Sequence, residues 1–484
     1  MKENFLRLSN KVKNVINRRK IKEIGNALND TSSVRWYDWL IVLPIIIFCY
    51  LSFNHGDMLI TSTHGKDLIE CIVTGKFWDF YDYTQSTAVY SIVLYLVFAV
   101  WSIPVFLVYT ISGTPLWGVV DFFAIPYPVL MWYKLLPTLA YFGIAYLIYK
   151  ILKEIGISNQ IAKWSSYLFI ASPISIFSQF IFGQYDSLGL FLTVLALYMF
   201  IKKKYYAFSI CCAFAIAFKL FALFFFVPLI VLAEKRVLHI IKYSAIALSI
   251  YVLCARLFST SVGYQNANSF NNGIMGRLFS TGITTSLGVI SLFTVAMMIV
   301  CVYAYNKKPT SDSEYYACSI YIPFFVFGAL FAFILWHPQW VMFLIPFMVM
   351  AYVLNDKTNS AIILHIAMGI GYIGATVMFF VNNVDSSMLG LGIFKEIFGA
   401  RDIEGIASYF TFDGNLGSAM YYSLFAGSIF ITEYLCFPTK DKVNALSDVI
   451  DSKKTFSADR IFTMLLPMVV LIFVLPSLIN FFSV

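Results

Sequence analysis

The sequence predicts an all-α polytopic membrane protein with about 12–14 transmembrane helices and a large first external loop. Three observations lead to this class. The 484 residues are 60% hydrophobic and 12% charged, whereas a soluble domain has roughly 25% charged residues. Apolar runs of about twenty residues, the length of a helix that spans a bilayer, recur along the chain. Strands of a membrane barrel would be short and alternating, so helices remain to satisfy the backbone in lipid.

Basic residues set the expected orientation. The net charge of +8 lies mainly in residues 1–35, which contain only three acids, and in a few short loops. Because cytoplasmic segments carry the excess of lysine and arginine, we expect residues 1–35 to form a cytoplasmic arm of a multi-pass cell-membrane protein. The lipid bilayer is thus an expected partner, and the same distribution excludes a nucleic-acid binder.

Metal and disulfide chemistry is not expected. The eight cysteines show no paired spacing, and most lie inside apolar runs, so they read as small core residues. Asp79 and Asp82 would share one face of a helix and suit a divalent cation, but carboxylates at this spacing are common on protein surfaces. We therefore expect no cofactor.

The first polar segment, 54–85, is the stretch around which the chain is organised. It holds two of the five histidines and several carboxylates, and it is too polar to span a membrane. A helix is predicted after Asp57, ending at Gly75. Its expected apolar stripe consists of Leu68, Ile69, Ile72 and Val73. Asp57 is the best candidate for the catalytic carboxylate of a membrane enzyme; the alternative is that it caps this helix.

The remaining apolar segments predict the other spans in order. Besides 36–53, they lie near 88–112, 131–150, 164–182, a segment running to 200, 206–233 (crossed twice or re-entrant), 237–257, 282–304, a segment ending at 336, 341–354, 360–381, 418–436 and 461–482. Polar external loops are expected at 259–281 and 382–415. The expected organisation is a basic arm (1–35), a transmembrane domain (36–436) with the external loop 54–87, a cytoplasmic loop (437–460) and a last span (461–484).

One conflict concerns the sides of the membrane. If the first loop is external, two simple spans between 88 and 150 place Lys150 and Lys163 outside, whereas lysines favour the inside. Either this region holds an extra crossing or a re-entrant piece, or the lysines break the rule. We expect the turn Gly183–Ser187 to face outward.

The apolar block 206–233 is interrupted by Lys219 and lies between two charge clusters. Two crossings in 28 residues are short and broken, which is tolerated only where the backbone lines a cavity. A lysine at the centre of a membrane helix costs on the order of 2.5–3.5 kcal/mol and usually has a function. We interpret Lys219 as a cation that binds a lipid-linked phosphate; the alternative is a lysine that snorkels from a short helix.

Polar residues at three further boundaries are candidates for substrate binding. Gln184 and Asp186 lie in the G-Q-Y-D-S turn between two spans, where an amide and a carboxylate would orient a sugar hydroxyl; the alternative is a tight turn. His337 precedes a proline that ends or kinks a helix; the alternative is a histidine in an interfacial aromatic belt. Arg277 lies in the polar external loop before the next span.

These pieces together resemble one family. They are an acid just after the first span, Phe80-Tyr81-Asp82-Tyr83, Lys134-Leu135-Leu136, G-Q-Y-D-S at 183–187, A-I-A-F-K-L-F-A-L-F-F-F-V-P at 215–228 and a His-Pro-aromatic motif at 337–340. Over about residues 36–350 the chain is similar to bacterial relatives of the second mannosyltransferase of GPI-anchor synthesis, in the GT-C class of glycosyltransferases. It departs from that pattern at Gln85–Ala88, where relatives often carry Pro-Pro, and at Pro338-Gln339, where they often carry Glu-Arg.

The resemblance implies transfer of a sugar from a polyprenyl-phosphate donor to a glycan, lipid or protein acceptor on the outer face, with Asp57 as general base. A positioned carboxylate that deprotonates an acceptor hydroxyl contributes typically about 10²–10⁴-fold. Cations stabilise the departing phosphate, a role that suits Lys219 first and then Arg277 or His337. The expected function is therefore a membrane hexosyltransferase of the cell envelope, with mannose as one candidate sugar.

Other classes explain the sequence less well. The main alternative is a transporter or flippase of lipid-linked saccharides, which would show internal repeats with paired broken helices; the sequence shows no repeat. A polysaccharide polymerase would carry paired arginines in a late external loop, but the loop 382–415 contains only Arg401. A structural scaffold does not account for an intramembrane lysine.

Overall fold

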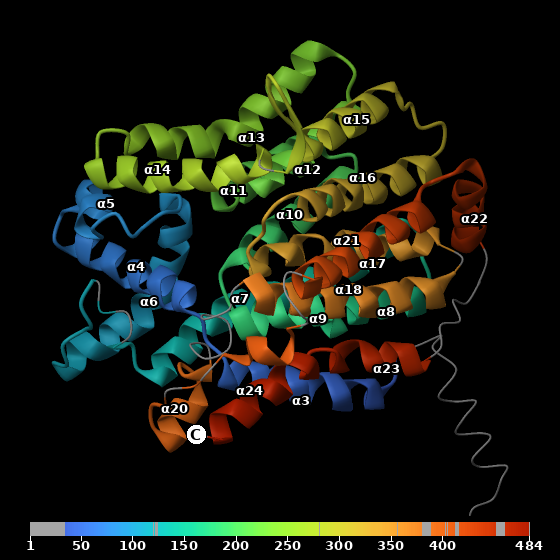
Figure 1. Ribbon diagram of the computed structural model, residues 1–484. Coiled ribbons are helices and arrows are strands. Elements are labelled where there is room, and N and C mark those ends of the chain that lie inside the picture. The colour runs from blue at the N-terminus through green and yellow to red at the C-terminus, as the bar shows by residue number, and fades with distance from the viewer. Residues whose placement is uncertain are drawn as a thin grey trace, which may run out of the picture.

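The computed structural model describes residues 34–119, 121, 124–279, 281–355, 357–379, 389–401, 403, 405–411, 416–451 and 460–483. Helices run side by side through most of the molecule (Figure 1). Within these residues the only sheet is one antiparallel hairpin, β1 (Gly282–Thr285) and β2 (Gly288–Ser291). The predicted all-α class is confirmed, whereas the expected arm at 1–35 lies almost entirely outside the described residues.

A central bundle holds most of the long helices and the largest hydrophobic core. In chain order it consists of α7 (Tyr127–Glu154), α8 (Asn159–Ala171), α9 (Pro173–Ile176), the π-helix η3 (Phe177–Phe182), α10 (Asp186–Ile201), α11 (Tyr205–Phe218), α12 (Phe221–Ala233), α13 (Val237–Leu257), α15 (Leu292–Asn306), α16 (Asp312–Phe333), the 3-10 helix η5 (Pro338–Phe343), α17 (Ile345–Ala351), η6 (Tyr352–Leu354), α18 (Thr358–Phe379) and α21 (Leu416–Cys436). The first and last of the described helices lie together along one edge of this bundle: α3 (Trp36–Ser52), α23 (Arg460–Met468) and α24 (Leu471–Ser483) (Figure 1).

Shorter elements gather at the two ends of the bundle (Figure 1). One end carries α4 (Gly56–Val73), η1 (Phe77–Asp79), α5 (Phe80–Tyr83), α6 (Ile92–Ser112), α14 (Val262–Met275), η4 (Gly276–Phe279), α20 (Ile393–Phe398) and η7 (Ile406–Tyr409). The opposite end carries α22 (Lys440–Asp451). A second hydrophobic cluster joins α4 and α6 to the start of α7, so the first end is packed onto the bundle.

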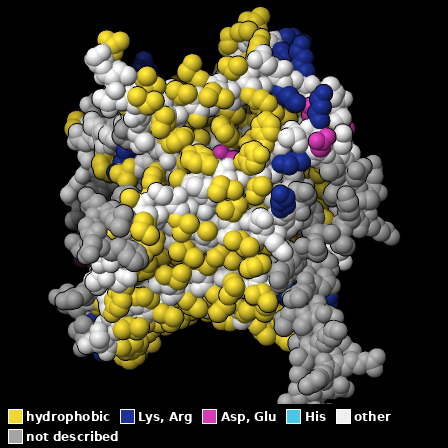
Figure 2. Space-filling view, turned by 45° about the vertical axis from the view of Figure 1, so that its right-hand side comes forward, with side chains coloured by type: hydrophobic (Ala, Val, Ile, Leu, Met, Phe, Trp, Pro, Cys, Tyr) yellow, Lys and Arg dark blue, Asp and Glu magenta, His cyan; other side chains and the backbone are white. Residues whose placement is uncertain are grey.

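The described helices fit a polytopic membrane protein. Six are long and apolar enough to cross a membrane, or eight if two bent helix pairs are each one span. Five further apolar helices are shorter. The predicted number of about 12–14 spans is therefore reached only when the short helices are included. Figure 2 shows a broad hydrophobic surface with lysine and arginine gathered along one edge, as expected for a protein in a bilayer.

The predicted interruption of the block 206–233 is confirmed. α11 ends at Phe218 and α12 begins at Phe221. Lys219 between them is extended, with φ −153° and ψ 119°. The two helices span 14 and 13 residues, so each is shorter than the about 20 residues of a full span.

Two predicted boundaries near α14 are wrong. The expected loop 259–281 contains a helix, because α14 lays Ala267 against the core while its asparagines stay at the surface. The expected span 282–304 begins ten residues late, at Leu292, since the β-hairpin occupies its first part. Gly288 in the hairpin has φ 135°, a conformation that glycine adopts most readily.

The predicted helix after Asp57 is confirmed, but its apolar stripe is partly wrong. Ile72 and Val73 are 49% and 70% exposed, while the polar middle of the helix is buried. The reason is close packing of α4 on α6: a Cβ on Gly65 would lie 2.7 Å from the backbone carbonyl carbon of Phe98. The polar side chains beside Gly65 are then enclosed and pair with one another.

The chain leaves α3 and enters α7 at the same end of the bundle. Tyr127 donates its hydroxyl to the carbonyl of Leu51 at 2.8 Å, and Tyr50 donates to the carbonyl of Met131 at 2.6 Å. The helices α4 and α6 between them therefore add no net crossing, although α6 is long and apolar enough to span.

This arrangement resolves the conflict over the lysines. α7 ends at Glu154, whose carboxylate lies 3.3 Å from the ammonium of Lys202 at the end of α10. Lys150 and Lys163 therefore lie at the same end as the triad 202–204, which we call the lysine face. We call the opposite end, with α4 and α14, the α4 face; the turn between η3 and α10 lies there.

We expect the α4 face to be external, because the lysine face carries the basic clusters. In a protein whose native cysteines are replaced by alanine, Ser269→Cys on α14 should react with an impermeant thiol reagent added to intact cells. Lys308→Cys, beyond the end of α15, should react only after permeabilisation. Both positions are exposed, and the opposite labelling pattern would invert the orientation.

Candidate active site

Asp57 lies in the first turn of α4, where the chain bends by 68° after α3. The N-cap is His55, whose Nδ1 accepts a hydrogen bond from the backbone N–H of Asp57 at 3.2 Å, so the alternative of Asp57 as the cap residue is wrong. The His55 ring stacks on Phe182 with centroids 3.9 Å apart. The Asp57 side chain is 35% exposed. A carboxylate held at a helix N-terminus and open to solvent suits proton transfer.

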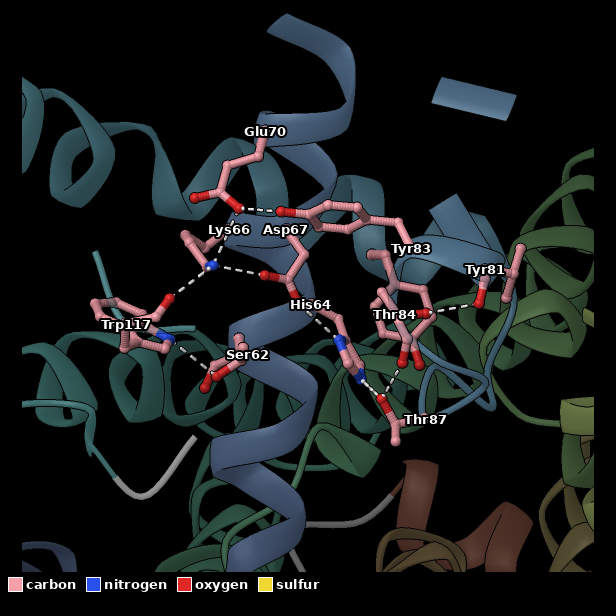
Figure 3. A network of polar contacts seen from close by, with 12 residues as sticks. Ser62, His64, Lys66, Asp67, Glu70, Tyr81, Tyr83, Thr84, Thr87 and Trp117 are labelled. Atoms are coloured by element: carbon pink, nitrogen blue, oxygen red, sulfur yellow. Dashed lines mark hydrogen bonds and ion pairs between the residues drawn. The ribbon is translucent and has the colours of Figure 1, made fainter. Parts of the chain in front are cut away.

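A buried polar network fixes the middle of α4 (Figure 3). Lys66 lies 2.6 Å from the carboxylate of Asp67 and donates to the carbonyl of Trp117 at 3.0 Å. His64 joins the same carboxylate, at 3.0 Å, to the hydroxyl of Thr87, at 3.1 Å. Buried charges persist only where they are paired and hydrogen-bonded. The network ties α4 to the loops on either side of α6 and so fixes the direction of its N-terminal turn.

Lys134 on α7 holds the end of α3 against η3. Its ammonium donates to the carbonyls of Tyr50 at 2.8 Å, Phe53 at 2.5 Å and Phe180 at 2.8 Å. Gly183 follows with φ 58°, and a Cβ there would lie 3.3 Å from Lys134 Cε. The last carbonyls of a helix lack partners within that helix, and in a bilayer water does not replace them. Lys134 supplies the missing donor at both breaks.

Lys219 and Asp186 form a buried ion pair at 2.8 Å, with side chains 10% and 1% exposed. The ammonium also lies over the rings of Trp340 at 5.0 Å and Tyr185 at 5.2 Å, distances at which a cation is attracted to a ring face. The structure thus pairs two predicted site residues from different segments, and it places Lys219 inside rather than at a lipid-facing helix end.

Tyr90 connects this pair with Asp57. Removal from water, followed by the carboxylates of Asp57 and Asp186, raises the pKa of Tyr90 well above its ordinary value, so the phenol stays protonated. Gln184 donates from its amide to the Tyr90 hydroxyl at 3.1 Å and accepts from Gln339 at 2.7 Å. Gln184 is thus engaged at both ends by protein groups and fixes Tyr90.

His337 lies at the same place, with its ring centroid 4.8 Å from that of Trp340. Burial, followed by the positive charges of Arg277 and Lys219 and by His55, lowers the pKa of His337 to about 3. The imidazole is therefore neutral at physiological pH.

A cavity of about 170 Å³ opens beside Lys219. Its walls come from the break between α11 and α12, from α13 and from α14, with Tyr90, Tyr185 and Trp340 at the Lys219 end. Asp57 does not line it. The cavity thus lies on one side of the polar cluster, next to the candidate phosphate ligand.

All six predicted site residues gather at the α4 face: Asp57, Gln184, Asp186, Lys219, Arg277 and His337. The prediction missed Tyr90, Gln339 and Lys134. Lys134 is part of the Lys134-Leu135-Leu136 motif but is not among the predicted site residues, although a lysine in an apolar run is the signal that identifies Lys219. Nothing in the sequence near Tyr90 marks it, because its partners come from distant segments. No cluster of histidine, cysteine or carboxylate suited to a metal ion occurs in the described part of the chain.

No protein-family model matches the chain, and no curated protein matches it. Among solved structures, the chain is similar to the crystal structure of ArnT from Cupriavidus metallidurans bound to undecaprenyl phosphate. The sequences are 12% identical, the match covers 86% of this chain and 77% of that chain, and the TM-score is 0.38.

Lys134→Met should destabilise the protein, because it leaves buried carbonyls without a donor at a cost on the order of 1–3 kcal/mol each. The thermal midpoint in detergent should fall clearly. Lys150→Met, on the same helix near the lysine face, serves as the control and should leave the midpoint nearly unchanged. Equal midpoints for both variants would show that Lys134 does not hold the helix ends.

Proposed function

We propose that the protein is an integral-membrane glycosyltransferase of the GT-C class. It transfers a hexose, with mannose as the first sugar to test, from a polyprenyl-phosphate donor to a cell-envelope glycan, lipid or protein on the outer face. Asp57 is the general base. Lys219 binds the donor phosphate together with Arg277 and His337, while Asp186 and Gln184 hold Lys219 and Tyr90 in place.

The observation that supports this function best is that an accessible carboxylate, Asp57, and a buried cation, Lys219, lie at the same face beside a cavity. Asp57 reaches solvent, and Lys219 lies in the cavity wall. In addition to burial, the charge of Asp57 raises the pKa of Tyr90, and the charge of Lys219 lowers the pKa of His337. Transfer from a lipid phosphate needs these two groups, a base for the acceptor and a cation for the leaving group.

The bond changes follow from this arrangement. The acceptor hydroxyl attacks the anomeric carbon of the donor sugar, and its proton passes to the carboxylate of Asp57. The bond between the anomeric carbon and the phosphate oxygen breaks, and the phosphate leaves with the electron pair. Lys219 and Arg277 stabilise the charge on the departing phosphate. Neutral His337 provides a ring nitrogen without adding a charge.

Asp57→Asn should lower transfer from a polyprenyl-phosphate hexose by about 10²–10⁴-fold while donor affinity stays close to that of the native protein, because the amide keeps the shape but accepts no proton. Radiolabelled sugar transfer with purified protein measures the rate. Asp79→Asn, an exposed acid of the same segment, is the matched control and should retain the native rate.

Native turnover by Asp57→Asn would remove this residue as the base. Movement of a lipid-linked saccharide across vesicle membranes without any sugar transfer would show that the protein is a flippase and not a glycosyltransferase.

Lys219→Ala should weaken binding of the polyprenyl-phosphate donor by about tenfold or more, and Lys219→Arg should retain part of the affinity. Because Lys219→Ala leaves Asp186 as an unpaired buried carboxylate, the double variant Lys219→Ala with Asp186→Asn separates loss of the cation from loss of the pair. Lys203→Ala on the lysine face is the control. Unchanged donor affinity in the double variant would exclude Lys219 as the phosphate ligand.

A further inference from the structure

The cavity beside Lys219 has an unusual lining. Nine of its 22 lining residues are aromatic, against 18% of the whole chain. They include Tyr251 on α13, Tyr264 on α14, Phe221 on α12 and Trp340 in η5. Aromatic rings offer flat apolar faces with polar atoms at their edges.

The amide side chains that line the cavity all come from one helix. Asn268, Asn271 and Asn272 on α14 line it, each able to donate and accept. Asn271 also donates to the carbonyl of Val89 at 2.6 Å, which fixes α14 over the cavity. Lys219 is the one charged lining residue, and Asp186 balances it. The cavity therefore offers amides and hydroxyls to a ligand and almost no net charge.

This lining favours a sugar over an isoprenoid chain. Methyl and methylene groups of a lipid would strip water from the amides and phenols and leave them without partners, which is costly. A pyranose ring instead presents C–H faces to the aromatic rings and hydroxyls to the amides. A cavity of about 150 Å³ is large enough to bind benzene, so the volume of about 170 Å³ suits one ring.

We propose that this cavity is a subsite for a single pyranose ring, held between the aromatic faces with its hydroxyls on the asparagines of α14. The inference rests on the proposed glycosyl transfer and names the substrate group that lies beside Lys219. The ring belongs either to the lipid-linked donor or to the end of the acceptor, and the chemistry of recognition is the same for both.

The test fills the cavity from α13. Ala255 lines it, so Ala255→Phe should exclude a ring, whereas Ala245→Phe, at an exposed position of the same helix, is the matched control. The probes are polyprenyl phosphate without sugar, polyprenyl-phosphate mannose and glucose, and the methyl glycosides of mannose, glucose, galactose and N-acetylglucosamine. Binding is followed by tryptophan fluorescence, since Trp340 lines the cavity, and by calorimetry.

Ala255→Phe should lose about tenfold or more affinity for the sugar-bearing probes that the native protein binds, and none for sugar-free polyprenyl phosphate. Loss confined to the lipid-linked sugars assigns the donor ring, and loss confined to the methyl glycosides assigns the acceptor. Equal loss for sugar-free polyprenyl phosphate, or no loss at all, overturns the proposal.

Two further measurements keep the outcome decisive. If Ala255→Phe does not fold, Asn272→Ala removes one amide without filling the space, and native affinity for every sugar in that variant overturns the proposal. If the native protein binds methyl glycosides but no polyprenyl phosphate, the proposed donor is wrong while the sugar subsite stands.

Discussion

The ion pair between Lys219 and Asp186 joins the segments from which the site is built. An ammonium and a carboxylate are each costly in a low-dielectric interior, and only their close pairing makes both tolerable. The pair links the extended residue between α11 and α12 to the first turn of α10. Tyr185 and Trp340 close around the ammonium, so the cavity wall, the Gly183–Ser187 turn and the start of η5 are all fixed by one charge.

The same constraint explains the second buried lysine. Wherever a helix breaks inside the bundle, its last carbonyls need a donor, because lipid offers none. Lys134 donates hydrogen bonds to carbonyls at the end of α3 and in η3. The start of α4, which follows α3 directly, is therefore fixed. The network of Lys66, Asp67 and His64 fixes the other half of α4. Asp57 thus stands on a helix that is held at two places.

The sequence is informative where a charged residue lies within or beside an apolar segment. Lys219 stands out because a charge in an apolar block is expensive, and Asp57 stands out as an acid just after a span. In the structure both residues lie at the α4 face. Tyr90 and Gln339 give no such signal, since a tyrosine or glutamine near an interface is ordinary. Their importance comes from partners far away in the sequence, such as Gln184.

Hydropathy likewise located most spans but misjudged the α4 face. The helix α14 is polar in composition, and hydrogen bonds to Asp82 and to the carbonyl of Val89 hold it in place. No local sequence pattern records such contacts. The hairpin β1–β2 replaced part of a predicted span because its sequence is apolar, and apolarity alone does not separate a strand from a helix. In α4 the buried residues of the middle, 61–67, are mostly polar, against the rule for an amphipathic helix, because neighbouring charges satisfy one another.

The shortness of α11 and α12 has a consequence for the bilayer. At about 1.5 Å per residue, helices of 14 and 13 residues extend about 20 Å, whereas the hydrocarbon core is about 30 Å thick. The end of α11 that carries Lys219 thus stops short of the far headgroup layer, unless the bilayer thins beside it. In either case a phosphate that meets Lys219 sits below the usual level of the headgroups. A lipid phosphate can therefore reach Lys219 without leaving the bilayer, because the lysine itself lies below the headgroup level.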